Sequence, residues 1–110
     1  MAFDPILADR IRQYFARNRN FTEKKMFGGI CFLLDGNMCC GVLGDELIIR
    51  VKPEEGEAIL REKHTRVFDF SGRPSKNMMF VGPGALQKDA DLERWLQITL
   101  KYVQSLPPKP

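Results

Sequence analysis

The stretch that decides the fold is KKMFGGICFLLDGNMCCGVLGDELIIRV, from Lys24 to Val51. Within it, Asp35-Gly36 is a strong hairpin signal, because a type I′ turn needs positive φ at both central residues. Gly44-Asp45 signals a second turn, and the residues flanking both turns are mainly apolar. The stretch therefore predicts a three-stranded meander with strands at 30–34, 38–43 and 47–52.

The pair Gly28-Gly29 in the segment MFGGI has the composition of a phosphate-binding loop but not its context. A phosphate loop precedes a helix, whose first N–H groups and dipole face the anion. Here the two glycines precede a predicted strand. We therefore expect them to allow a bend or a close backbone approach at the edge of the sheet.

Helical patterns stand on both sides of the meander. Asp4-Pro5 begins the first, since an acceptor side chain at the cap and proline in the first turn both favour a helix start. Pro53 opens the second, and Asp89 begins a third that carries one apolar stripe. Short strands are predicted at 66–70 and 77–81. The order is αβββαββα, an α+β fold whose antiparallel sheet carries its helices on one side.

The length of the chain, 110 residues, predicts a single domain over residues 1–110. Apolar residues make up 44%, and a domain of this size can bury a core without metal or disulfide support. Such a domain has little room for a large catalytic cleft as well. We therefore expect function at a surface or at a dimer interface.

The net charge of +3 is concentrated in the first 25 residues, which hold six basic and three acidic groups. The other 85 residues hold 11 of each sign. A basic segment attracts acidic partners or nucleic acid, although a solvated helix face has the same composition. The candidate anion contacts are Arg10 and Arg17 in this segment and Arg73 in the predicted loop SGRPS.

The chain is expected to be cytoplasmic and to have no contact with a membrane. Its start, MAFDPILADR, has no long apolar run of the kind found in signal peptides, and no segment has the roughly 18–20 apolar residues of a membrane span. Three cysteines form no secreted disulfide framework, so we expect reduced thiols.

The cysteines offer one candidate for reactivity. If the first hairpin turns on Asp35-Gly36 alone, Cys31 faces Cys40 and Phe32 faces Cys39 across the strands. The facing thiols lack the Cys-x-x-Cys spacing of redox sites, and three thiols on flat strands suit zinc poorly. We interpret Cys31 and Cys40 as core residues and take Cys39, on the other face, as the candidate reactive thiol. No catalytic, cofactor or metal site is predicted.

The same register gives the meander two apolar faces, although a sheet face open to water is usually polar. One face is the natural core beneath the helices. Burying each large apolar side chain of the other is worth roughly 1.5–3 kcal/mol, so that face needs a cover. A symmetric homodimer or another protein partner would supply it. The residues of this candidate partner face are Ile30, Phe32, Leu34, Leu43 and Ile48.

Several segments taken together resemble the N-terminal domain of the TfoX/Sxy family. They are EKKMFGGICFLLDGNMCCGVLGDELIIRV, then FDFSGRP, then an aliphatic helix with Trp95 and the ending SLPPK. The resemblance covers about residues 5–109 in the right order. One departure is Ser75, which stands where the family often has a methionine after Gly-Arg-Pro.

The resemblance implies a fold similar to the secretion-chaperone-like α+β modules, which often dimerise. It also implies a link to the regulation of natural competence, in which full-length members act with a transcription activator. The sequence is expected to be a stand-alone N-terminal module that lacks the family's C-terminal helical domain, and no catalytic residues are implied for the module. We therefore predict a non-enzymatic regulatory or protein-interaction module. The alternatives are a nucleic-acid-binding protein that uses the basic first helix, and a small thiol-based redox or ligand-binding protein that uses Cys39.

Overall fold

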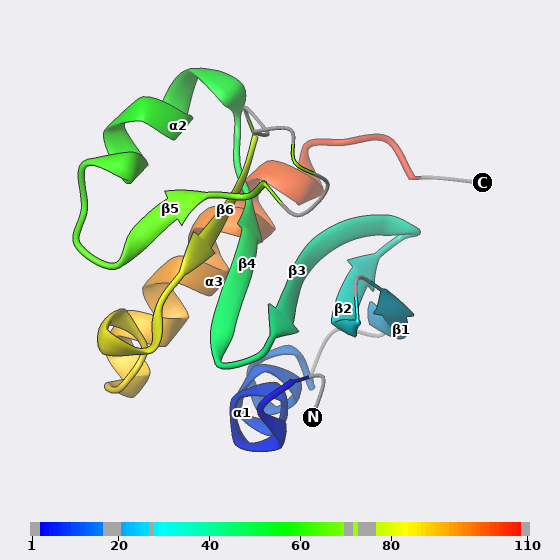
Figure 1. The fold of residues 1–110 in the computed structure, drawn as a ribbon. Helices are drawn as coiled ribbons and strands as arrows, with labels where there is room; N and C mark the ends of the chain where they lie inside the picture. Colours follow the sequence, from blue (N-terminus) through cyan, green and yellow to red (C-terminus); the bar gives the residue numbers. More distant parts are fainter. Residues whose placement is uncertain (1–2, 17–20, 27, 70–71, 73–76, 109–110) are drawn as a thin grey trace.

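The computed structural model of the chain describes residues 3–16, 21–26, 28–69, 72 and 77–108. Its helices and strands form one antiparallel sheet of order β1-β2-β3-β4-β6-β5 together with three α-helices and a short 3-10 helix (Figure 1). In chain order the elements are α1 (Pro5–Phe15), β1 (Phe21–Met26), β2 (Gly29–Leu34), β3 (Asn37–Leu43), β4 (Glu46–Arg50), α2 (Pro53–Leu60), β5 (Thr65–Val67), β6 (Met78–Val81), η1 (Pro83–Ala85) and α3 (Asp89–Gln104).

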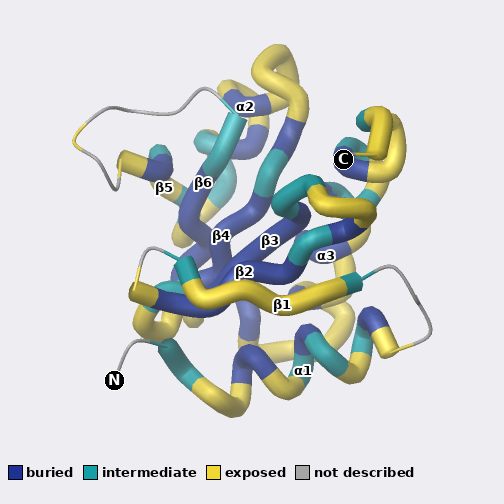
Figure 2. The backbone as a smooth tube through the Cα atoms, turned by 90° about the vertical axis from the view of Figure 1, so that its right-hand side faces the viewer, coloured by how far each residue is buried: buried dark blue, intermediate teal, exposed yellow. Residues whose placement is uncertain are grey.

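The predicted α+β fold with an antiparallel sheet is confirmed, and the sheet has one strand more than the sequence predicted. This strand, β1, has the sequence FTEKKM and pairs with β2 at the edge of the sheet. Its four central residues are exposed, whereas β2, β3 and β4 are mainly buried (Figure 2). An edge strand rich in charged residues resists pairing with other chains, and it also lacks the apolar alternation by which strands are predicted.

The helices pack on one face of the sheet, as predicted. The Asp4 carboxylate accepts a hydrogen bond from the backbone N–H of Ile6 at 2.9 Å, so the predicted start of α1 is confirmed. The α3 helix lies behind β4 and β6 in Figure 1 and contacts β3 and β4. Side chains of α1 and α3 and Ile59 of α2 join the sheet in one main core, to which the two long helices contribute Leu7, Ala8, Ile11, Phe15, Leu92, Trp95, Leu96 and Val103.

The turn between β2 and β3 has the predicted geometry. Asp35 and Gly36 have φ values of 51° and 84°, the positive pair that a type I′ turn requires. Gly29, at the start of β2, makes the expected close backbone approach. A Cβ atom built on it would lie 2.1 Å from the carbonyl oxygen of Val42 on β3. Gly29 therefore has a structural role in the sheet, since it permits the close approach of β2 and β3.

The register of the β2–β3 hairpin changes between the second and the third residue pair from the turn. Next to the turn, Leu33 pairs with Met38, but Phe32 then pairs with Cys40, so Cys39 is an extra residue in β3. This is a β-bulge, which shifts everything beyond it by one position. The predicted pairs Cys31–Cys40 and Phe32–Cys39 are therefore wrong. The cause is the bulge, which a continuous run of apolar residues conceals.

The bulge also corrects the predicted partner face. Ile30, Phe32 and Leu34 point to the helices and lie in the main core, with exposed fractions of 5%, 2% and 6%. Only Leu43 and Ile48 of the five predicted residues lie on the opposite face, in a second cluster. Side chains of β2 still alternate between the two faces of the sheet. Because β3 has one extra residue, the β2 side chains on the core face are those of Ile30, Phe32 and Leu34, which the sequence had placed on the other face.

Candidate functional site

The face of the sheet opposite α3 carries a small apolar cluster. Ile48, Phe68 and Phe80 are buried in it, and Ile48 pairs with Phe80 across β4 and β6. Met38, Leu43 and Met78 are half-buried and pack against this cluster. We call the three half-buried residues, together with Ile48 and Phe80, the outer patch.

A charged residue closes one side of the outer patch. The guanidinium of Arg66 lies over the ring of Phe80, with its central carbon 4.1 Å from the ring centroid. The same guanidinium binds both carboxylate oxygens of Glu46, at 2.6 and 3.2 Å. The Glu46 carboxylate raises the pKa of Arg66, which favours the charged form of the pair. The outer patch therefore contains two of the five residues predicted for the partner face, Leu43 and Ile48, and the Arg66–Glu46 ion pair forms a polar rim beside it.

The three cysteines lie in the interior. Cys39 and Cys40 have exposed fractions of 0%, and that of Cys31 is 1%. Burial raises the pKa of the Cys31 thiol to about 11 and moves the pKa of Cys40 well above its ordinary value. Reactivity needs an accessible thiolate, and reagents in solvent do not reach Cys39 in this fold. The structure therefore gives no support to Cys39 as a reactive thiol.

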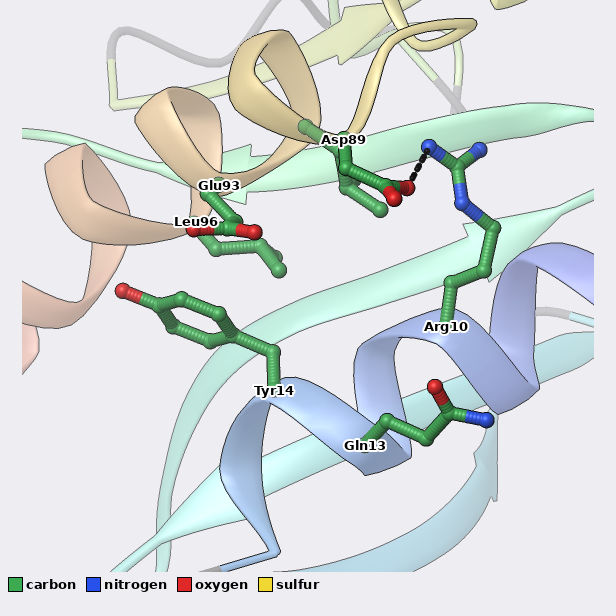
Figure 3. A pocket seen from close by; sticks show the side chains of 7 residues that line it. Arg10, Gln13, Tyr14, Asp89, Glu93 and Leu96 are labelled. Carbon is green, nitrogen blue, oxygen red and sulfur yellow. Dashed lines mark hydrogen bonds and ion pairs between the residues drawn. The ribbon is translucent and has the colours of Figure 1, made fainter.

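Of the candidate anion contacts, Arg10 lies in the described part of the chain, while Arg17 and Arg73 fall outside it. Arg10 lines a cleft of about 210 Å³ between α1 and α3, where Tyr14 faces α3 (Figure 3). Its Nη2 atom lies 3.1 Å from a carboxylate oxygen of Asp89, and Glu93 lines the same cleft. These two carboxylates oppose the charge of Arg10, so the cleft does not favour an anion.

The neighbouring Arg12 is engaged in the same way. It binds both carboxylate oxygens of Glu23 on β1, at 2.8 and 2.9 Å, and also reaches Asp9 at 2.6 Å. These contacts tie α1 to the edge strand. The basic first helix therefore presents less free charge than the sequence suggested, and its geometry gives no support to nucleic-acid binding.

A threonine separates two strands at the centre of the sheet. β3 and β4 pair from Leu43 and Glu46 as far as Cys40 and Ile49. At the next position the Thr99 hydroxyl of α3 donates to the carbonyl of Cys39 and accepts from the N–H of Arg50 at 2.9 Å. The hydroxyl thus stands where a direct hydrogen bond between the strands would be expected. Beyond this point the strands diverge, and we call the gap the β3–β4 fork.

A cavity of about 530 Å³ lies at the β3–β4 fork. The guanidinium of Arg50 donates from Nη1 to the carbonyl of Met38 at 3.3 Å and lies 5.8 Å from the ring centroid of Tyr102. The chain end after α3 forms another wall, where Asn37 donates from Nδ2 to the carbonyl of Pro107 at 2.9 Å. The cavity is lined by Asn37, Met38, Arg50, Asn77, Met78, Leu106, Pro107 and Pro108.

Neither Thr99 nor Arg50 is among the site residues that the sequence predicted. A threonine within the apolar stripe of the last helix was the available signal for the first. For Arg50 the signal was a cation in an otherwise apolar strand, LIIRV. Neither signal identifies a site, because the contact between the two residues depends on the packing of α3 on the sheet.

Two absences hold for the part of the chain that the structure describes. It contains no group of three or more His, Cys, Asp or Glu side chains arranged to hold a metal ion. It also contains no helix with the length and apolar character needed to cross a bilayer.

The architecture defines the class of protein, an α+β module whose described residues form three α-helices packed on a six-stranded antiparallel sheet. Comparison of the sequence with protein families gives the particular one. The TfoX N-terminal domain matches residues 13–102. The chain therefore belongs to the TfoX N-terminal domain family, as its motifs indicated. Comparison with curated proteins and with solved structures finds no match.

Proposed function

We propose that this chain is a non-enzymatic protein-interaction module that self-associates, or binds a protein partner, through the outer patch. One observation carries the proposal. The long helices pack on one face of the sheet, whereas the opposite face presents the half-buried side chains of Met38, Leu43 and Met78 around Ile48. Partly exposed apolar side chains gathered on one sheet face are typical of association surfaces.

The chemistry of the outer patch suits a protein surface. Methionine is flexible and polarisable, and it adapts to apolar partners of different shape. Leu33 is also half-buried and pairs with Met38, which extends the apolar surface along β2. The Arg66–Glu46 pair at the rim could meet its twofold-related copy in an isologous dimer.

The regulatory part of the proposal rests on membership of the TfoX N-terminal domain family. A link to natural competence or to the control of transcription follows from the family resemblance. We include it in the proposal as the role that association through the outer patch would serve. The cytoplasmic location is proposed from the sequence, whose three cysteines form no secreted disulfide framework.

The experiment is a measurement of mass in solution by sedimentation equilibrium, over about 10 to 200 µM protein. We expect a dimer for the unaltered chain and a monomer for Leu43→Asp, because a carboxylate would be desolvated in the interface. The matched control is Ile6→Asp, which makes the same change at an exposed apolar residue of α1, 71% accessible. A monomer for the unaltered chain throughout this range contradicts self-association.

A further inference from the structure

We propose that the cavity at the β3–β4 fork binds a small organic carboxylate, with Arg50 as the cation that recognises it. The proposal does not depend on self-association, because the described residues that line the cavity all belong to one copy of the chain. Three observations support it. Arg50 forms no ion pair among the described residues, the described lining of the cavity suits an anion with an apolar body, and Thr99 forms hydrogen bonds with both strands of the fork.

Arg50 is a half-buried cation without a carboxylate partner among the described residues. The ion pairs of that part of the chain use Arg10, Arg12, Arg66 and Arg94. The side chain of Arg50 instead reaches one neutral acceptor, the Met38 carbonyl, at 3.3 Å. A guanidinium has five N–H donors, so a single carbonyl leaves most of its capacity for a ligand.

The walls of the cavity favour an anion with an apolar body. No acidic side chain occurs among the described residues that line it. Met38, Met78 and Leu106 supply apolar surface, while the Asn37 and Asn77 side chains are polar groups on the same lining. The cleft at Arg10 is the contrast within this chain, because Asp89 and Glu93 line it and Arg10 is paired.

A carboxylate matches this cavity better than a phosphate. The planar guanidinium presents parallel donors at the spacing of the two oxygens of a carboxylate. Phosphate sites commonly combine several cations or the N–H groups at a helix N-terminus. Among the described residues that line this cavity, Arg50 is the one cation. A singly charged carboxylate is therefore the ligand that balances it.

The cavity is held open before any ligand arrives. The Thr99 hydroxyl forms hydrogen bonds with both strands at the position where their pairing ends. It thereby holds the backbone of Arg50, whose side chain lines the cavity. On the opposite wall the Asn37 side chain holds the carbonyl of Pro107. A volume of about 530 Å³ lies within the roughly 300–1,000 Å³ of small-molecule sites. Binding therefore requires no rearrangement of the sheet.

The first experiment uses the unaltered protein and a series of small probes. Sodium hexanoate, 1-hexanol, acetate and inorganic phosphate are titrated separately, and the backbone amides are followed by ¹H–¹⁵N correlation spectra. We expect saturable shifts with hexanoate at Asn37, Met38, Arg50 and Met78, and binding of hexanol and acetate weaker by about tenfold or more. Three results would overturn the proposal: no saturation with hexanoate, equal binding of hexanol, or phosphate binding as tight as hexanoate binding.

The second experiment alters the cation. Arg50→Met keeps a long apolar side chain but removes the charge, and we expect hexanoate affinity to fall about tenfold or more. Arg61→Met makes the same change at an exposed arginine that follows α2, outside the cavity, and should leave affinity unaltered. Equal affinities for the two variants contradict the role of Arg50.

A spectroscopic readout covers the case in which Arg50→Met does not fold. In the unaltered protein the side-chain Nε–H resonance of Arg50 should shift on adding hexanoate, with the same dissociation constant as the backbone amides. A resonance that stays in place while the amides shift would show that the ligand does not contact this guanidinium.

Discussion

The hydroxyl oxygen of Thr99 on α3 accepts the backbone N–H of Arg50 on β4 at 2.9 Å. The same hydroxyl donates to the carbonyl of Cys39, the extra residue of the β3 bulge. Thr99 has an exposed fraction of 0% and is the buried polar residue of the described core. A helix side chain thus bridges β3 and β4 at the position that follows their last residue pair, Cys40 and Ile49.

Replacing Thr99 by valine tests this relationship. Valine has nearly the same shape, but it would leave the Cys39 carbonyl and the Arg50 N–H buried without a partner. Each unsatisfied group costs about 1–3 kcal/mol, so we expect the free energy of unfolding to fall by about 2–4 kcal/mol. Urea unfolding measures it, and exchange of the Arg50 amide with solvent should accelerate.

The matched control for this variant is Thr99→Ser, which keeps the hydroxyl and removes one methyl group. Its cost should be limited to about 1 kcal/mol, the value of a buried methyl group. Valine and serine variants of equal stability would show that the hydroxyl has no structural role.

Replacing Gly29 by alanine tests the close approach of β2 to β3. The new Cβ would lie 2.1 Å from the Val42 carbonyl oxygen and 3.1 Å from its carbon, both of them backbone atoms. Because the backbone has to move, we expect a loss of stability of about 1–3 kcal/mol, measured by urea unfolding.

Gly84→Ala is the control for the Gly29 variant. Its Cβ would also meet a neighbour, at 2.5 Å, but that neighbour is the ring of His64, an exposed residue whose side chain can turn away. We expect Gly84→Ala to cost clearly less than Gly29→Ala. The opposite order would show that contact with Val42 does not constrain this position.

The elements that the sequence predicted correctly are those marked by strong local signals. The start of α1 at Asp4-Pro5 and the turn at Asp35-Gly36 depend on the residues themselves, and both have the expected geometry. The edge strand β1 has no such signal, because FTEKKM is polar and forms a strand only by pairing with β2. Pairing between segments is a tertiary effect, which local propensity does not encode.

The bulge at Cys39 limited the prediction of the site. In the runs ICFLL and MCCGVL both strand phases are apolar, so alternation does not reveal an inserted residue. The predicted partner face was therefore divided between the two sides of the sheet. The fork between β3 and β4 and the contacts of Thr99 with both strands depend on how α3 packs on the sheet, and for that reason the sequence did not predict the cavity.

The contact between Arg12 and Glu23 provides a third prediction. It joins α1 to β1 through two hydrogen bonds at 2.8 and 2.9 Å, but both side chains are about 40% accessible, at 39% and 42%. Exposed pairs contribute about 0.2–1 kcal/mol. A double-mutant cycle with Arg12→Ala and Glu23→Ala should give a coupling energy in that range, and 1 M salt should reduce it. A coupling energy of zero at low salt would show that the Arg12–Glu23 contact does not stabilise the fold.

The buried thiol of Cys31 makes stability depend on alkaline pH. In the unfolded chain this thiol loses its proton near its ordinary pKa of about 9, whereas burial raises its pKa in the fold to about 11. Between these values the folded state binds more protons than the unfolded state, so the free energy of unfolding falls as pH rises. The contribution is complete below pH 9 and is lost as pH rises to about 11, at no more than about 1.4 kcal/mol per pH unit for one thiol.

Urea unfolding under reducing conditions from pH 7 to 11 measures this slope. Other groups contribute to the pH dependence as well, so the informative quantity is the difference between variants. Cys31→Ala should lower stability at pH 7 and give a shallower decline above pH 9, because one proton linkage is gone. Val103→Ala also removes buried apolar volume, from α3, but should keep the slope of the unaltered protein. If the free energy of unfolding of Cys31→Ala declines with pH as steeply as that of Val103→Ala, ionisation of the Cys31 thiol on unfolding does not contribute to the loss of stability at alkaline pH.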